Sequence, residues 1–304
     1  MEKIDFLAGR EERFFDFVNG LNEKDKIALI SHSIDIDGIV SAKVVNRVID
    51  AQIIKLVDYH DLNEDLLNEL KRNKINKVIV TDLGAEGSFF KELSKFCEVF
   101  IIDHHQFKED INNEKIIFLN VQGLCAAYIS YYLFSKIEDL EKIDWLVAIA
   151  SVADWLYKSN REFVESVYRK YGDSFTMGNV LSEQKGKFWK LLTDIYNSIL
   201  YFHKDVRKVY DALGEKFDDI GELSNYAREV QKEIDNDLEK FNKEKEEISG
   251  RDVFIYKPKF PTGSVISSMI SAKNMGKTLI IIEDKGHTFH VHARRQDQKE
   301  NMAI

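Results

Sequence analysis

The sequence predicts an α/β protein: a parallel-sheet domain, a helical insert or linker, and a smaller C-terminal α/β domain. From Lys26 to about Asp154, apolar runs of strand length alternate with helical patterns. These runs are continuous and β-branched, which is typical of a parallel sheet covered on both faces. The chain has 304 residues and a hydrophobic fraction of 44%, which is enough for one large core and a smaller one.

Strands and helices of the first region follow one another in a regular order. The expected strands are KIALIS at 26–31, QIIKLVDY at 52–59, KVIVTD at 77–82, VFIIDHH at 99–105 and IIFLN at 116–120. The expected helices run from Gly38 to Val48, Glu64 to Lys71, Phe89 to Lys95, Cys125 to Ser135 and Ile143 to Ala150. Strands separated by helices in this way build a parallel sheet from βαβ units.

In residues 161–250 the pattern differs, because apolar residues recur at helical spacing. The region ends in a charged amphipathic run, residues 230–250, which is typical of a solvated connecting helix. Aromatic residues in this stretch are more often core, although they could also stack on bases; they are Phe188, Trp189, Tyr196, Tyr201 and Phe202. After Gly250 strand signals return as DVFIYKP, TLIIIED and TFHVHARR, with a helix opened by PTGS. We expect a small α/β unit there.

Charge and cysteine content exclude some classes of protein. The formal net charge of −9 argues against a chain that coats nucleic acid along its whole surface, although a local basic site stays open. Cys97 and Cys125 cannot form a disulfide framework, so a reducing, intracellular setting is expected. No run approaches the roughly 18 apolar residues of a membrane span, and the N-terminus lacks a signal-like apolar core. We expect a soluble, cytoplasmic protein with no membrane partner.

Four segments that carry Asp or His share one placement in the sequence. SHSIDIDG, TDLG and DHHQ each follow an apolar strand directly, and SVADW is more helical. The carboxyl ends of parallel strands converge on one crevice, so the four segments are expected to face each other. Their oxygen and nitrogen donors, without cysteine, favour Mn²⁺ or Mg²⁺ over structural zinc. A helix N-cap is the alternative role for an isolated Asp37 or Asp82.

These segments resemble, in order and spacing, the four motifs of the DHH phosphoesterases. The matching residues are His32, Asp35 and Asp37 with Gly38, then Asp82, then Asp103, His104 and His105, then Asp154. The superfamily includes RecJ-type single-strand exonucleases, small-oligonucleotide hydrolases, phosphoadenosine phosphatases and manganese-dependent inorganic pyrophosphatases. The resemblance covers about residues 26 to 155.

The resemblance implies a role for each residue. Six of them would bind two divalent ions, with Mn²⁺ as the expected metal and Mg²⁺ as the alternative. His32 and Asp35 would bind one ion, Asp37, His104 and Asp154 would bind the other, and Asp82 would bridge both. His105 would face the substrate phosphate, and Asp103 would orient the histidine next to it. The two-residue gap between His32 and Asp35 departs from the one or three residues of many relatives.

Metal physics then supplies a mechanism without a protein nucleophile. Two divalent ions about 3.5–4 Å apart lower the pKa of a shared water and stabilise charge on the phosphoryl oxygens. In agreement with this, the sequence has neither a G-x-S-x-G elbow nor a Walker loop, and GAEG at 84–87 is too short for a phosphate cradle.

The C-terminal region resembles the small accessory domain, DHHA1, that follows many DHH cores. The resemblance lies in PTGSVISSMISAKN and VHARRQDQKENM, and it implies that Arg294, or else Arg295, grips a substrate phosphate. A solvated strand end is the alternative. The run with His287, His290 and His292 is interpreted as ordinary strand, since no carboxylate is evident nearby. The glycine-rich G-G-H signature of relatives is not reached before Ile304, which leaves truncation open.

We therefore expect three domains: 1–160, the DHH metal-binding catalytic domain; 161–250, the helical insert and linker; and 251–304, an incomplete DHHA1-like substrate-binding domain. The expected function is a metal-dependent single-strand exonuclease in DNA repair or replication, similar to archaeal RecJ-like proteins. The alternatives are an oligoribonuclease or phosphoadenosine phosphate phosphatase, and, in another class, a non-catalytic replication scaffold. Single-stranded nucleic acid is the expected partner. A helicase or replisome partner, a homo-oligomer, the polarity of digestion and the preference for DNA or RNA stay open.

Overall fold

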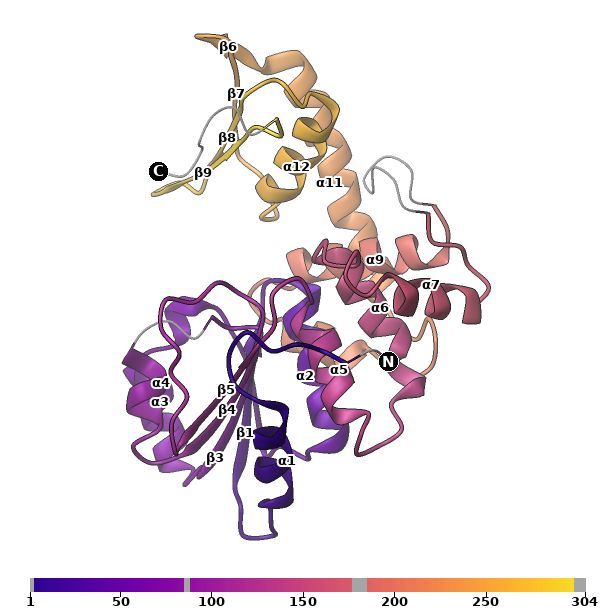
Figure 1. The fold of residues 1–304 in the computed structure, drawn as a ribbon. Coiled ribbons are helices and arrows are strands. Elements are labelled where there is room, and N and C mark those ends of the chain that lie inside the picture. Colours follow the sequence, from indigo (N-terminus) through magenta and orange to yellow (C-terminus); the bar gives the residue numbers. More distant parts are fainter. Residues whose placement is uncertain (1–2, 85–87, 177–184, 298–304) are drawn as a thin grey trace. The chain divides into compact units, whose positions relative to one another are not determined.

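The computed structural model describes residues 3–84, 88–176 and 185–297 (Figure 1). The chain divides into two compact units. Unit 1 comprises Met1–Phe175, Lys185–Leu192 and Asp205–Gly221, and unit 2 comprises Thr176–Gln184, Thr193–Lys204 and Glu222–Ile304. The predicted fold class is confirmed, because unit 1 holds a five-stranded parallel sheet with helices and unit 2 a second, smaller sheet.

The sheet of unit 1 is parallel throughout, in the order β2-β1-β3-β4-β5. Its strands are β1 (Ile27–His32), β2 (Ile53–Val57), β3 (Lys77–Thr81), β4 (Glu98–Asp103) and β5 (Ile116–Asn120). Every residue of β1, β3 and β5 is buried, as their continuous apolar sequences predict. Strand β2 lies on one side of β1, and the chain then crosses to the other side to form β3. The carboxyl ends of β1 and β3 are therefore the switch point at which ligands bind in such sheets.

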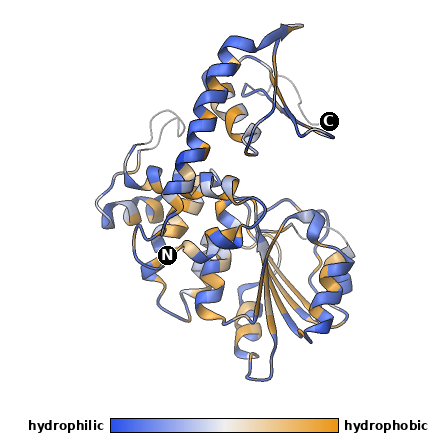
Figure 2. Cartoon of the chain, turned by 180° about the vertical axis from the view of Figure 1, so that it is seen from behind, coloured by the Kyte–Doolittle hydropathy of each residue, from blue (hydrophilic) through white to orange (hydrophobic). Residues whose placement is uncertain are grey.

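Helices cover both faces of this sheet (Figure 1). Those of unit 1 up to residue 170 are α1 (Glu11–Asn19), α2 (Ile36–Val48), α3 (Glu64–Arg72), α4 (Ser88–Leu93), α5 (Ala126–Phe134), α6 (Asp144–Ala153) and α7 (Arg161–Lys170), with 3-10 turns η1 (Tyr59–Asp61) and η2 (Glu141–Ile143). Leu70 of α3 and Phe90 of α4 belong to the core cluster on one face. On the other face α2 packs on α5 and α6, and Phe14 of α1 contacts Phe100 of β4. Figure 2 shows the apolar sheet between helices with hydrophilic outer surfaces.

The expected helical insert contributes to both units. Helix α10 (Arg207–Ala212) belongs to unit 1, α11 (Leu223–Glu244) to unit 2, and α9 (Lys187–Tyr201) has residues in each. Most of the charged run lies in a helix, α11, as predicted, but this helix is not solvated all round. One side of α11, which includes Val230 and Ile234, lies in the core of unit 2. The aromatic side chain of Phe188 is fully buried and stacks on Tyr168, which is a core role.

Unit 2 carries a four-stranded sheet in the order β6-β7-β8-β9. The strands are β6 (Glu246–Ile248), β7 (Arg251–Tyr256), β8 (Leu279–Asp284) and β9 (Phe289–Arg294), and α12 (Gly263–Lys273) lies between β7 and β8. Only the β7–β8 pair is parallel. Strand β6 lies within the run that was expected to be helical.

Three further features of the structure concern helix α1, the cysteines and the lengths of the helices. Helix α1 was not predicted, although Phe14 and Phe17 form its buried face. The two cysteines, Cys97 and Cys125, are buried and unpaired. Within the described residues, no helix has both the length and the apolar character that a membrane crossing requires.

Candidate active site

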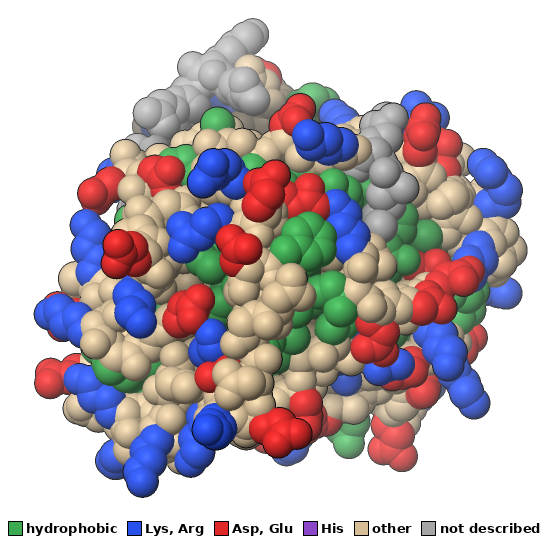
Figure 3. Space-filling model, turned by 60° about the horizontal axis from the view of Figure 1, so that its bottom comes forward, with side chains coloured by type: hydrophobic (Ala, Val, Ile, Leu, Met, Phe, Trp, Pro, Cys, Tyr) green, Lys and Arg blue, Asp and Glu red, His purple; other side chains and the backbone are tan. Residues whose placement is uncertain are grey.

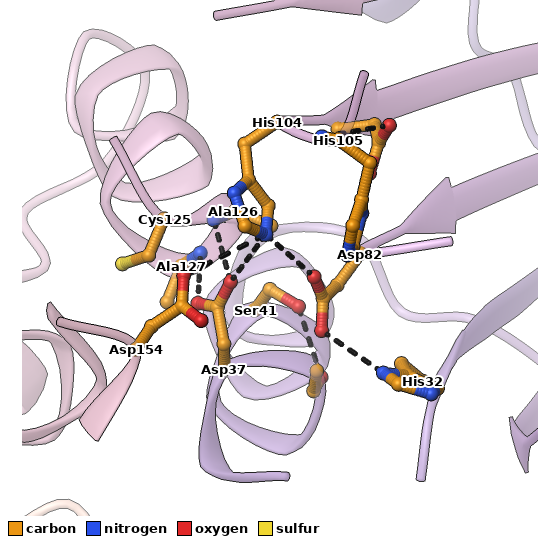
Figure 4. Close-up of polar contacts among 12 residues, drawn as sticks. His32, Asp37, Ser41, Asp82, His104, His105, Cys125, Ala126, Ala127 and Asp154 are labelled. Atoms are coloured by element: carbon orange, nitrogen blue, oxygen red, sulfur yellow. Dashed lines mark hydrogen bonds and ion pairs between the residues drawn. The ribbon is translucent and has the colours of Figure 1, made fainter. Parts of the chain in front are cut away.

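The side chains of the four sequence motifs meet at the carboxyl edge of the unit 1 sheet (Figure 4). They come from different elements: His32 ends β1, Asp35 is the N-cap of α2, Asp37 lies in its first turn, Asp82 follows β3, Asp103 ends β4 with His104 and His105 after it, and Asp154 is the C-cap of α6. Residues more than a hundred positions apart in the chain therefore form one cluster.

One part of the cluster consists of His32, Asp35 and Asp82, which offer ligand atoms within 4.8 Å of one another. The Nδ1 atom of His32 lies 3.1 Å from Asp35 Oδ2 and 3.5 Å from Asp82 Oδ2. Both His32 Nε2 and Asp82 Oδ2 are buried and have no hydrogen-bond partner among the described residues. Buried polar atoms without a partner are costly and need an explanation, and a bound cation near Asp82 Oδ2 would give one.

A second part consists of Asp37, His104 and Asp154. The Nε2 atom of His104 lies 3.8 Å from Asp37 Oδ2 and 3.6 Å from Asp154 Oδ2. The same nitrogen lies 3.2 Å from Asp82 Oδ1. Asp82 therefore directs Oδ1 towards the second part of the cluster and Oδ2 towards the first. Asp82 thus occupies the position that a bridging ligand would need.

Local backbone conformation places these groups. Asp82 has a left-handed φ of 58°, a conformation that Asp tolerates better than most residues. Gly38 lets α2 start close to β1, because a Cβ there would lie 2.2 Å from the carbonyl oxygen of His32. The capping role belongs to Asp35, which accepts the Gly38 N–H at 2.9 Å. Asp37 is therefore not the N-cap of its helix.

Three partners of the site were missed in the sequence. The carboxylate of Asp37 accepts hydrogen bonds from the backbone N–H groups of Ala126 and Ala127, at 2.7 and 2.8 Å, in the first turn of α5. Asn120 donates to the carbonyl of His105 at 2.9 Å. The signal for Asn120 was present, since it ends a strand as the other site residues do, whereas backbone donors leave no signature in the sequence.

Burial shifts the acidity of the cluster. It raises the pKa of Asp37 and of Asp82 well above their usual range, and the nearby carboxylates add to the effect. Burial also raises the pKa of Asp154 to about 6. For His32, burial lowers the pKa, but the nearby carboxylates of Asp35 and Asp82 outweigh it and bring the pKa to about 10. Interactions with His32 also outweigh burial at Asp35 and lower its pKa. The chain's own cationic groups therefore balance Asp35 but not Asp37, Asp82 or Asp154.

The residues fit a pair of divalent cations. Their donors are carboxylate oxygens and imidazole nitrogens, which suit Mn²⁺ and Mg²⁺. Asp82 and Asp154 each have a buried oxygen without a hydrogen-bond partner among the described residues, and the pKa of each is raised. A bound cation would interact with these oxygens and would lower both pKa values.

Asp103 and His105 form a hydrogen-bonded pair at the cluster, where His105 also offers a ligand atom within 4.8 Å of those of Asp82 and His104. Asp103 is fully buried, and its Oδ1 lies 2.8 Å from His105 Nδ1. The sequence predicts that Asp103 orients the histidine next to it; its partner in the structure is His105 rather than His104. This hydrogen bond raises the pKa of His105 and fixes the orientation of its ring.

The two arginines predicted to bind substrate lie in unit 2. Arg294 donates from Nε to Ser267 Oγ at 2.8 Å and from a terminal nitrogen to Ser264 Oγ at 3.2 Å. Arg295 pairs instead with Asp297, at 2.7 Å. The end of the VHARRQDQKENM string, from residue 298, and residues 85–87 of GAEG lie outside the described residues.

One premise about the histidines of β9 is corrected. A carboxylate is present near His292, because Glu283 Oε2 of the neighbouring strand β8 lies 3.6 Å from its Nε2. The two strands pair antiparallel, which brings residues together that are not close in the sequence. His290 is exposed, and His287 is exposed in the turn before β9.

Comparisons with known proteins agree with this architecture. Residues 26–158 match the family model described as DHH family, N-terminal domain. The chain is similar to exonuclease RecJ bound to manganese, with a TM-score of 0.64 and 15% identity over 91% of this chain and 81% of that chain. RecJ in complex with Mn²⁺ from Thermus thermophilus gives a TM-score of 0.63 and 16% identity over 93% of this chain. This chain covers 47% of that protein.

A third similar structure is an exopolyphosphatase-related protein from Bacteroides fragilis. Its TM-score is 0.52 at 12% identity, over 95% of this chain and 84% of that chain. No curated protein matches the sequence. At these identities the solved structures establish the fold alone, and the family model matches residues 26–158, less than half of the chain.

Proposed function

We propose that this chain, which carries a DHH-family N-terminal domain and has a RecJ-like fold, is a divalent-metal-dependent phosphodiesterase that removes nucleotides from single-stranded nucleic acid. The observation that carries the proposal is the position of Asp82, whose two carboxylate oxygens face His104 and His32. Such a shared ligand is what a paired-ion site requires, and paired ions are a common device for phosphodiester hydrolysis.

In this proposal the six clustered side chains hold two ions. One is held by His32, Asp35 and Asp82, and the other by Asp37, His104 and Asp154, with Asp82 shared. When bound, the ions lower the pKa of an attacking water and neutralise charge that develops on the phosphoryl oxygens. The backbone N–H groups of α5 hold the carboxylate of Asp37 in place. Mn²⁺ is the proposed ion and Mg²⁺ the alternative.

His105 is the proposed contact to the scissile phosphate. Its hydrogen bond to Asp103 raises its pKa and so favours the imidazolium form. A protonated imidazole donates a charge-assisted hydrogen bond to a phosphoryl oxygen, and these bonds are about twice as strong as neutral ones. Asp103 acts through His105, as a positioning residue.

Arg294 is the proposed phosphate contact of unit 2. Two serine hydroxyls of α12, on Ser264 and Ser267, accept hydrogen bonds from its guanidinium and fix its direction. A guanidinium held in this way pairs with phosphate in a defined geometry. Arg295 is the weaker candidate, because Asp297 already pairs with it.

The net charge of the chain and the face drawn in Figure 3 favour a local substrate contact over a continuous basic track. On the face drawn in Figure 3, Lys and Arg side chains are interspersed with Asp and Glu. The formal net charge of −9 agrees with this mixture. We therefore expect affinity for single strands to come from the metal centre and a few specific side chains. A role in DNA repair or replication, with a helicase or replisome partner, belongs to the same proposal.

The test is hydrolysis of 5′- and 3′-labelled 20-residue single strands of DNA and RNA with Mn²⁺, Mg²⁺ or EDTA. We expect metal-dependent stepwise shortening from one end, and a loss of about a thousandfold or more in Asp82→Asn, because the ions supply several kcal/mol of transition-state stabilisation. Asp50→Asn, an exposed aspartate of the same unit, is the matched control and should keep full activity.

Other outcomes would point to the alternative functions. Cleavage restricted to di- and trinucleotides or to phosphoadenosine phosphate would indicate a small-oligonucleotide hydrolase or phosphatase. The absence of metal-dependent hydrolysis on every substrate would favour a non-catalytic scaffold.

A further inference from the structure

A tryptophan follows the site residue Asp154 in a backbone conformation that tryptophan disfavours. Helix α6 ends with hydrogen bonds from the N–H of Leu156 to the carbonyl of Ser151 (3.1 Å) and from the N–H of Trp155 to that of Val152 (3.2 Å). This is the Schellman pattern, in which the residue after the C-cap is left-handed and is usually Gly or Asn. Trp155 occupies that position with a φ of 61°. The turn alone would be better made by glycine.

Core packing does not explain Trp155 either. Its side chain is 50% exposed, whereas Trp145 at the other end of the same helix is fully buried. No ring contact to Trp155 is found among the described residues, although many other aromatic side chains of unit 1 have one. A bulky residue that is strained and half-exposed next to a catalytic group is typical of a functional constraint.

Two other exposed uncharged side chains belong to this region, Tyr59 by contact with His32 and Ile34 by its position in the sequence. Ile34, between His32 and Asp35 in the sequence, is 54% exposed, and Tyr59, whose ring centroid lies 5.4 Å from that of His32, is 46% exposed. The Tyr59 hydroxyl accepts the N–H of Gly84 at 3.2 Å, which fixes its ring. The acidic cluster is therefore flanked by uncharged apolar groups.

We infer that Trp155 is a base-binding residue, which stacks on a nucleobase next to the phosphate at the metal centre. The inference rests on the proposed function and deepens it, because it assigns recognition of the base to this side chain. Aromatic stacking suits any of the bases, so the contact would not select sequence. It does require an unstacked base with a free face, and inside a duplex both faces of each base are occupied by its neighbours. An uncharged contact also suits a site crowded with carboxylates, where phosphates are repelled unless cations are present.

Two substitutions separate stacking from a structural role. Trp155→Gly removes the ring and gives the turn its preferred residue, and Trp155→Phe keeps an aromatic face. With Mn²⁺ and a ten-residue oligothymidylate, we expect Trp155→Gly to raise KM roughly tenfold, the effect of losing one base stack, with little change in kcat. Trp155→Phe should restore most of the affinity. Thermal stability of Trp155→Gly should equal or exceed that of the wild type.

An abasic ten-residue strand with the same phosphates is the matched substrate. The wild type and Trp155→Gly should cleave it with equal KM, because it has no base to stack. An unchanged KM of Trp155→Gly on oligothymidylate would overturn the inference. An equal loss on the abasic strand would overturn it as well, since the ring would then act on something other than a base.

A binding measurement keeps this test apart from the proposed function. Oligothymidylate should quench indole fluorescence in the wild type and in Trp189→Phe, but much less in Trp155→Phe. Quenching without hydrolysis would contradict the proposed activity and leave the base contact standing. Hydrolysis without any quenching through Trp155 would contradict the base contact alone, and an absence of binding would contradict both.

Discussion

Buried carboxylates in the two units differ in how their charge is balanced. In unit 1, burial and the charge of Asp35 raise the pKa of Asp82 well above its usual range. In unit 2, burial also acts to raise the pKa of Glu283, but the His292 imidazole 3.6 Å away, the hydrogen bond from the Gly263 N–H and the Lys285 ammonium outweigh it and lower the pKa to about 2. The chain's own groups balance the charge of Glu283, whereas they do not balance that of Asp82, for which we propose a bound cation. This difference separates a structural carboxylate from a metal-binding one.

Glu283 organises the start of α12. Its Oε1 accepts the N–H of Gly263 at 2.7 Å, and its Oε2 lies 3.1 Å from Lys285 Nζ. A Cβ on Gly263 would lie 2.5 Å from His292 Nε2 and 2.7 Å from the Glu283 carboxyl carbon, so this close approach requires glycine. The same first turn of α12 carries a serine that holds Arg294. A network that is neutral by itself thus positions the proposed phosphate contact.

Neutral replacements of these two carboxylates should change stability in opposite directions. Without metal, Glu283→Gln should lower the free energy of unfolding of unit 2 by about 1–3 kcal/mol, because charged hydrogen bonds to a buried group are lost. Asp82→Asn should raise that of unit 1 by about 1 kcal/mol, because its buried charge is unfavourable. Urea unfolding followed by tryptophan fluorescence reports on unit 1, since Trp145, Trp155 and Trp189 all belong to it. Hydrogen exchange of α12 reports on unit 2, and shifts of the same sign would contradict the comparison.

The dependence of stability on pH should differ in the same way. The folded-state pKa of Glu283, about 2, lies below its ordinary value of 4.5, so its contribution is lost as pH falls from 4.5 to 2. The folded-state pKa of Asp154, about 6, lies above its ordinary 3.8, so metal-free unit 1 should lose stability as pH rises from 3.8 to 6. Saturating Mn²⁺ should abolish the loss in unit 1 and leave unit 2 unchanged. A loss in unit 1 that persists with Mn²⁺ would contradict the role of Asp154.

The sequence predicted those features of the fold and the site that depend on residue type alone. Continuous β-branched runs predicted the parallel sheet, and the position of Asp82 and His104 directly after strands predicted their convergence. The first-turn amides of α5 that hold Asp37 could not be predicted, because backbone donors are the same in every residue. The pairing of His292 with Glu283 depends on strand register, which the sequence alone does not fix.

Backbone conformation and helix packing also limited what could be predicted from the sequence. Trp155 is not a residue type that predicts a left-handed turn, so its placement became evident only from the backbone. Helix α11 was recognised as amphipathic, but the sequence did not indicate where its apolar side, which includes Val230, Ile234 and Phe241, would pack. This side packs into the core of unit 2, which charge content alone could not indicate.

The proposed paired-ion site is tested most directly by a calorimetric titration of the metal-free protein with Mn²⁺. We expect two ions to bind per chain in the wild type and in Asp50→Asn. In Asp82→Asn we expect at least one of them to be lost, because this carboxylate faces both parts of the cluster. A wild-type protein that binds one ion or none, or an Asp82→Asn variant that binds two as tightly as the wild type, would contradict a centre built around Asp82.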